Sequence, residues 1–227
     1  MKKEAVSRNS KNKKFGSIRL GFMSGIGLVV FLFIMTVISG MLSTTMIVPW
    51  GLTLFENLII TILTVLFGFG FYGLGKKYDS TFLKVISILV ILFVIVSFLA
   101  VIFVLSPIMT NVMTSVTSIA SNMNINPQNI TSEQQQAFMT ALFSDSTLVA
   151  YVGAMVILFL IYVIIAAILS ILLGIALIRI RKNVKYAKTA GILEIVGGAT
   201  AIIIVGFVVM LVAFVYELII LKRESKN

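Results

Sequence analysis

The chain of 227 residues contains no cysteine and no histidine. Their absence excludes thiol chemistry, disulfide bonds, zinc sites built from these residues and catalysis by a histidine base. Charged residues are also scarce, at 11% of the chain against about 25% in soluble domains, while 59% of the residues are hydrophobic. Because too few polar side chains remain to coat a water-soluble globule, we expect the chain to lie in lipid.

Apolar runs long enough to cross a bilayer account for most of the chain. A membrane helix needs about 20 residues to cross roughly 30 Å of hydrocarbon, and a single charged residue, Glu56, lies between Arg19 and Lys76. This stretch is expected to divide near Pro49 and Trp50, since a proline beside an interfacial tryptophan is typical of a turn at the bilayer surface. The predicted spans are residues 20–42, 53–74, 82–106, 147–179 and 189–221.

These runs predict an all-α fold, a polytopic transmembrane helix bundle with five spans. Each run is expected to be helical because backbone amides in lipid must be satisfied locally, and continuous apolar runs exclude the alternating strands of a barrel. The first run is too long for a signal peptide and is expected to be a retained anchor. The expected regions are a basic cytoplasmic tail (1–19), spans one to three (20–106), an outer loop (107–146), spans four and five (147–221) and a C-terminal tail (222–227).

Basic residues near the span ends predict the orientation, because Lys and Arg prefer the cytoplasmic side. Fifteen of the 18 lie in the N-terminal tail and in the turns that follow spans two and four, and residues 107–146 contain none. This distribution predicts an N-in/C-out protein of the cytoplasmic membrane with residues 107–146 outside. The remaining basic residues follow the fifth span and would prefer the cytoplasm, which would require a re-entrant turn near Gly197 and Gly198; both alternatives stay open.

Two segments of the chain are similar to each other. Residues 70–105 align with residues 174–209 at a constant offset of 104, which pairs Gly70 with Gly174 and Lys84 with Lys188. The alignment predicts a helical hairpin with a basic turn that is used twice in the same orientation.

The outer loop carries its own helical pattern. Met109, Val112, Met113 and Val116 recur at helical spacing, and Thr131–Gln134 is a predicted capping box that opens a second short helix. These helices are expected to cap the bundle or lie on the outer membrane surface; the alternative is a surface that recognises another protein. Asn129 begins an N-glycosylation triplet on the predicted outer side.

Two short motifs resemble a known family. They are Tyr186–Leu193 with Gly198 and Ile202–Phe207, and Gly73–Asp79 with Phe82. Both resemble the domain-of-unknown-function family 996, a group of prokaryotic, mainly archaeal, multi-pass membrane proteins. The resemblance implies an integral membrane protein and brings no activity and no functional residues.

Glycines are expected to mark close helix contacts. Gly68–Gly73 matches the dinucleotide-binding fingerprint, but it closes an apolar span and does not follow a strand, so helix packing is the better interpretation. Gly21 and Gly25 have the spacing of a small-xxx-small motif, which favours packing within the chain over a homodimer. The predicted packing residues are Gly21, Gly25, Gly68, Gly70, Gly197 and Gly198.

No catalytic, cofactor-binding or metal-binding residue is predicted. Glu56 and Glu217 are expected close to the outer interface and Glu194 within two turns of the cytoplasmic one, each solvated or paired. The functional alternative is that Glu56 and Glu217 together form a cation site in an outer vestibule. Asp79 and Asp145 are expected on opposite sides of the bilayer, which excludes an intramembrane aspartyl protease.

These features predict a non-enzymatic accessory or interaction protein of the membrane, and the alternative is a channel or transporter for a small solute or ion. The expected partners are the lipid bilayer and either another membrane protein or further copies of the chain. The basic N-terminal tail is explained by topology and by attraction to anionic lipids, so no nucleic-acid partner is expected. No cofactor is expected.

Overall fold

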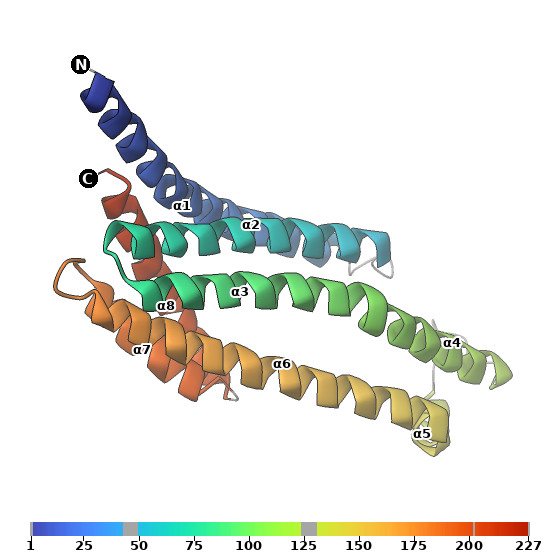
Figure 1. Ribbon diagram of the computed structural model, residues 1–227. Helices are drawn as coiled ribbons and strands as arrows, with labels where there is room; N and C mark the ends of the chain where they lie inside the picture. The colour runs from blue at the N-terminus through green and yellow to red at the C-terminus, as the bar shows by residue number, and fades with distance from the viewer. Residues whose placement is uncertain (1, 43–49, 124–130, 202, 227) are drawn as a thin grey trace. The chain divides into compact units, whose positions relative to one another are not determined.

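The computed structural model describes residues 2–42, 50–123, 131–201 and 203–226, and within these ranges it contains helices and turns but no strand (Figure 1). This confirms the predicted all-α class. The elements in chain order are α1 (Lys2–Leu42), α2 (Trp50–Lys77), α3 (Thr81–Ala100), the π-helical turn η1 (Val101–Leu105), α4 (Ser106–Asn122), α5 (Ser132–Ser144), α6 (Ser146–Arg179), α7 (Ala187–Ala199) and α8 (Ile204–Glu224).

Five helical segments are long and apolar enough to cross a membrane. They are Gly16–Ile38, Gly51–Lys77, Thr81–Asn122, Ser146–Arg179 and Val205–Glu224. The first four segments agree with the predicted spans, although the third segment continues through η1 and α4 to Asn122. The fifth does not, because the predicted span 189–221 is divided into a short helix, α7, and a longer one, α8.

The chain forms two compact units, Met1–Phe98 with Val163–Asn227 (unit 1) and Leu99–Tyr162 (unit 2). In unit 1, helices α1 and α2 run side by side (Figure 1) and pack closely at glycines. Gly21 faces Gly70, and a Cβ atom at Gly21 would lie 2.9 Å from the backbone nitrogen of Gly70. Around these contacts is a core to which six helices contribute: Ile18, Phe71, Leu74, Leu83, Leu177, Ala190, Ile220 and Leu221.

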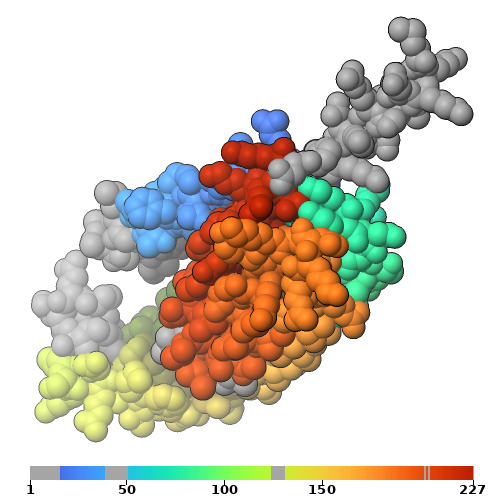
Figure 2. Space-filling model, turned by 90° about the vertical axis from the view of Figure 1, so that its left-hand side faces the viewer, coloured from blue at the N-terminus to red at the C-terminus, as the bar shows by residue number. Residues whose placement is uncertain are grey.

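The end of α8 lies beside the turn between α2 and α3. Lys77 Nζ forms an ion pair of 2.7 Å with Glu224, and Arg179 stacks 4.2 Å above the ring of Phe82. The three segments therefore share one end of unit 1, and Figure 2 looks onto this end, with the red C-terminal residues beside the orange end of α6 and the green turn. The C-terminal tail therefore lies at the same end as the α2–α3 turn, which agrees with the alternative in which the last apolar stretch turns back. The side of the membrane on which this end lies stays a prediction.

Helices α7 and α8 form a hairpin whose turn lies between Ala199 and Ile204. Ile203 has an extended backbone, and the Thr200 hydroxyl donates to the carbonyl of Val196, which closes α7. A Cβ atom at Gly206 would lie 2.7 Å from the backbone nitrogen of Ala201, so only glycine permits the turn to pack on the start of α8. The hairpin corresponds to the alternative in which the last apolar stretch turns back, with the turn a few residues after Gly197–Gly198.

The repeat predicted between residues 70–105 and residues 174–209 stays a prediction.

Unit 2 contains the π turn, α4, α5 and the first part of α6. Pro107 has no N–H to donate to the carbonyl of Phe103, and the helix widens into η1 directly before it. The capping box predicted at Thr131 is confirmed, since Thr131 and Gln134 exchange hydrogen bonds of 3.1 and 3.2 Å. Asp145 caps α6 by accepting from the backbone nitrogens of Thr147 and Leu148 at 2.9 and 3.0 Å.

The shared end of unit 1 predicts the sidedness of the tail. The chain has no native cysteine, so Ser80→Cys and Ser225→Cys each provide one thiol for an impermeant maleimide. We expect both thiols to be labelled from the same side of sealed vesicles. Labelling of the two positions from opposite sides would contradict the arrangement of α8.

Candidate functional site

The two glutamates of the last hairpin are buried together in unit 1. Glu194 lies in the middle of α7 and is 6% exposed, and Glu217 lies in the second half of α8 and is 3% exposed. Their carboxyl groups interact directly with each other. The hairpin brings Glu217 beside Glu194, whereas a single span would have put them at opposite ends. The distance of Glu217 from either membrane interface stays a prediction.

A serine of a third helix completes the cluster, which we call the carboxyl pair with Ser170. The Ser170 hydroxyl, on α6, is buried and lies 3.0 Å from the backbone carbonyl oxygen of Glu194. It also donates to Oε2 of the Glu194 side chain. The cluster therefore joins α6, α7 and α8.

Small residues bring α6 and α7 close enough for this contact. A Cβ atom at Gly191 would lie 2.7 Å from Cγ1 of Ile178, and one at Gly198 would lie 2.8 Å from the carbonyl oxygen of Ala167 and 3.2 Å from Cβ of Ser170. Because larger side chains at these positions would separate the helices, the glycines hold Ser170 within hydrogen-bonding reach of Glu194.

Helix α8 presents Glu217 from a stripe of residues that faces α7. Gly197 of α7 packs against Gly206 and Met210 of α8, and Ala213 is fully buried one turn further along. Glu217 follows at the next position of the same stripe. Its Oε1 atom is buried and has no hydrogen-bond partner among the described residues.

Two carboxyl groups in contact, away from water, cannot both carry a negative charge at low cost. A single positive charge between them removes the repulsion and supplies the missing partner of Glu217. The arrangement can therefore hold one proton or one small cation.

The structure does not bring Glu56 to this cluster. The rings of Phe214 and Phe67 lie 5.0 Å apart, which places Glu217 near the level of Phe67 on α2. Glu56 lies 11 residues earlier in α2 (67 − 56), which is roughly 16 Å along the helix axis. This separation gives no support to the predicted vestibule formed by Glu56 and Glu217.

A second polar cluster lies at the shared end of unit 1. Besides the ion pair with Lys77, buried Glu224 accepts a hydrogen bond from the hydroxyl of Tyr78. Burial raises the pKa of Tyr78. The hydrogen bond that Tyr78 donates to Glu224 and the negative charge of the Glu224 carboxylate raise this pKa further. This cluster keeps Tyr78 neutral and fastens the end of α8 to the α2–α3 turn.

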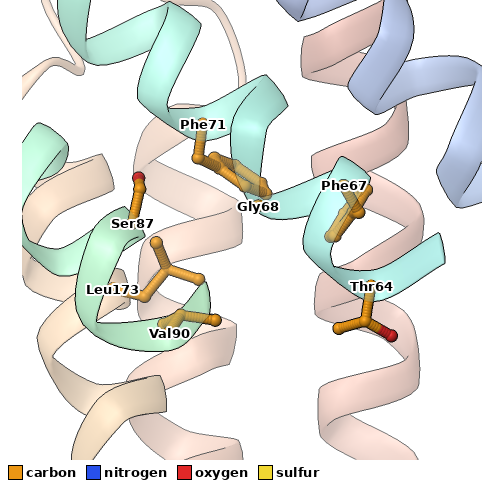
Figure 3. A pocket seen from close by; sticks show the side chains of 7 residues that line it. All are labelled: Thr64, Phe67, Gly68, Phe71, Ser87, Val90 and Leu173. Carbon is orange, nitrogen blue, oxygen red and sulfur yellow. The ribbon is translucent and has the colours of Figure 1, made fainter. Parts of the chain in front are cut away.

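The cavity between α2, α3 and α6 is small and apolar (Figure 3). It has a volume of about 40 Å³ and is lined by Thr64, Phe67, Gly68, Phe71, Ser87, Val90 and Leu173. Its two hydroxyl groups, on Thr64 and Ser87, already donate to backbone carbonyls at 2.8 and 2.7 Å. No polar group points to a ligand here, so we interpret it as a gap in helix packing.

The other predicted residues fall into two groups. All six glycines predicted for packing have close neighbours within the chain: Gly21, Gly25, Gly68, Gly70, Gly197 and Gly198. Asn129 lies outside the described residues. Within the described ranges, no group of three or more acidic side chains gathers to hold a metal ion.

Sequence reasoning missed the carboxyl pair because Glu194 and Glu217 are 23 positions apart in one apolar run (217 − 194). In a single span they would lie at opposite ends. Two features of the sequence could have revealed the pair: the apolar run 189–221 is longer than one span requires, and a basic tail follows it.

We predict that Glu224→Gln destabilises the protein by about 2 kcal/mol, because it leaves the Lys77 ammonium partly buried without its counter-charge. The measurement is denaturant unfolding of the purified protein, with Lys77→Met completing a double-mutant cycle. Asp79→Asn is the matched control, because Asp79 pairs with Lys84 at 3.2 Å but its side chain is 98% exposed. Equal effects of the two acidic substitutions would contradict a structural role for Glu224.

Comparisons of the chain with protein-family models, with curated proteins and with solved structures find no match.

Proposed function

We propose that this multi-pass membrane protein is a non-enzymatic interaction protein that binds another membrane protein through unit 2. The observation that carries the proposal is the length of α6, which exceeds the thickness of a bilayer while remaining apolar.

Helix α6 has 34 residues, which corresponds to about 51 Å against about 30 Å of hydrocarbon. Even a tilt of about 40°, the upper end of the usual range, leaves about 39 Å along the membrane normal. The helix ends at Arg179, the first residue of a basic turn, so the surplus lies at the Ser146 end in unit 2.

The surplus length of α6 is not polar. Val149 and Val152 are each about half exposed. Outside hydrocarbon, such a surface would face water unless another protein covered it, and exposed apolar surface of this kind is typical of interaction sites.

The rest of unit 2 has the same character. Phe103 and Phe143 are 72% and 73% exposed, and Leu148 is the one buried residue among the described residues of this unit. Residues 99–162 contain two charged residues, Glu133 and Asp145, and no Lys or Arg. We therefore propose a partner whose contact surface is apolar and helical.

The proposal orients the protein with the shared end of unit 1 in the cytoplasm. With the C-terminal tail at that end, its three basic residues join the fifteen of the N-terminal tail and the two turns. Lys and Arg prefer the cytoplasmic side, so the distribution of all 18 positive charges supports this orientation and the proposed location in the cytoplasmic membrane.

The proposal includes no enzymatic activity, because the chain offers neither histidine nor cysteine as a nucleophile or base. It takes no support from the resemblance to family 996, which implies no activity and stays a prediction.

We expect single thiols on unit 2 to be shielded in native membranes but not in liposomes that contain the purified protein alone. Phe143→Cys and Val149→Cys report on the apolar surface, and Gln135→Cys is the control at an exposed polar position of α5. Labelling by a water-soluble maleimide should be several-fold slower in native membranes at the first two positions only. Equal rates in both preparations would contradict a partner on unit 2.

A channel or transporter for a small ion is the second candidate, and the carboxyl pair with Ser170 is the observation that favours it. Buried acidic residues at a broken helix are typical of ion pathways in transporters. We expect this candidate, if correct, to give proton or Na⁺ flux into proteoliposomes that Glu217→Gln abolishes and Glu56→Gln preserves. Flux equal to that of empty liposomes would exclude it.

A further inference from the structure

We propose that Glu194, Glu217 and Ser170 form a buried binding site in unit 1 for one small cation, either a proton shared by the two carboxyl groups or a monovalent metal ion in its place. The site is independent of the partner proposed for unit 2. It needs neither a transport pathway nor a second copy of the chain.

The cluster has more acceptor oxygens than hydrogen-bond donors. The two carboxyl groups present four acceptor oxygens, and the Ser170 hydroxyl donates to one of them, Oε2 of Glu194. Glu217 Oε1 stays without a partner although Glu217 is almost completely buried. Since an unsatisfied buried polar atom is costly, the cluster lacks one donor or one positive charge.

The charges around the two carboxyl groups also indicate that a positive charge is missing. The other ionisable groups of the neighbouring helices are directed elsewhere: Lys188 of α7 is exposed, the ring of Tyr216 on α8 faces Tyr186, and Lys77 of α2 binds Glu224. The charged group that acts on each carboxyl is the other carboxyl. No basic side chain among the described residues neutralises the pair.

The ligand atoms and the packing define the class of cation. The available ligands are carboxylate, hydroxyl and carbonyl oxygens, which suit hard cations and not soft transition metals. Mg²⁺ keeps several waters in an octahedral shell, and the close contacts at Gly191 and Gly198 leave α6 and α7 no space for such a shell. A proton or a small monovalent ion fits these limits.

The site lies near one end of unit 1. Glu217 precedes Glu224 by two helical turns, so the pair lies roughly 10 Å from the shared end. The shortest route for a small cation is therefore from that end, without crossing the membrane.

The experiment measures thermal unfolding of the purified full-length protein in detergent as a function of pH, with NaCl or choline chloride at equal ionic strength. The proton-bound pair is the stable form, because removal of the proton leaves two negative charges in contact. We therefore expect the melting temperature of the wild-type protein to fall by about 4 °C or more from pH 5 to pH 9. A higher melting temperature in NaCl than in choline chloride at pH 9 would identify Na⁺ as a ligand of the site. Equal melting temperatures in the two salts would identify the proton as the only ligand.

Glu217→Gln replaces one carboxyl by a neutral amide that can donate to Glu194. We expect this variant to lose the pH dependence and to be more stable than the wild-type protein at pH 9. Glu194→Gln should behave similarly, whereas Glu56→Gln, the matched control, should keep the wild-type profile. Identical pH profiles for the wild-type protein and Glu217→Gln, with no specific effect of Na⁺, would overturn the proposal.

Infrared spectroscopy tests the site even if a variant folds poorly. The wild-type protein at neutral pH should show the carbonyl-stretch band of a buried protonated carboxylic acid, and this band should disappear at high pH or when Na⁺ replaces the proton. A wild-type protein that shows neither this band nor any spectral response to Na⁺ would overturn the proposal independently of the variants.

Discussion

In lipid, apolar side chains gain little from leaving acyl chains for a neighbouring helix, so helices associate by close packing of their backbones. Unit 1 depends on this constraint at three places: Gly21 against Gly70, Gly191 against α6, and Gly206 against the turn after α7. The first joins α1 to α2, the second joins α6 to α7, and the third folds α8 back along α7. The positions of Ser170, Glu194 and Glu217 follow from the second and third of these contacts.

Unit 2 is governed by a different constraint, the thickness of the bilayer. Helix α6 continues beyond the length that hydrocarbon can cover, and the continuation contains no charged residue and several exposed valines. Unit 1 has a core of its own, whereas unit 2 has exposed aromatic rings and little buried surface. Unit 1 thus holds the buried carboxyl groups, and under the proposed function unit 2 offers the surface that a partner would recognise.

Four spans and the capping box at Thr131 were predictable because they depend on local patterns, namely apolar length and the spacing of Thr131 and Gln134. The α7–α8 hairpin was not, since residues 189–221 are almost uniformly apolar and the turn is stabilised by the contact of Gly206 with Thr200, which no periodicity encodes. The carboxyl pair was unpredictable for the same reason. Glu194 and Glu217 meet only when this run is folded in two.

The gathering of basic side chains at one end of unit 1 has an electrostatic consequence. A positive surface potential lowers the local concentration of every cation relative to bulk water, and salt screens this potential over about 8 Å at physiological ionic strength. Anionic headgroups that collect around the same lysines and arginines would reverse its sign. The lipid composition of the surrounding leaflet would thus tune how readily a cation approaches Glu217, without any change in the protein.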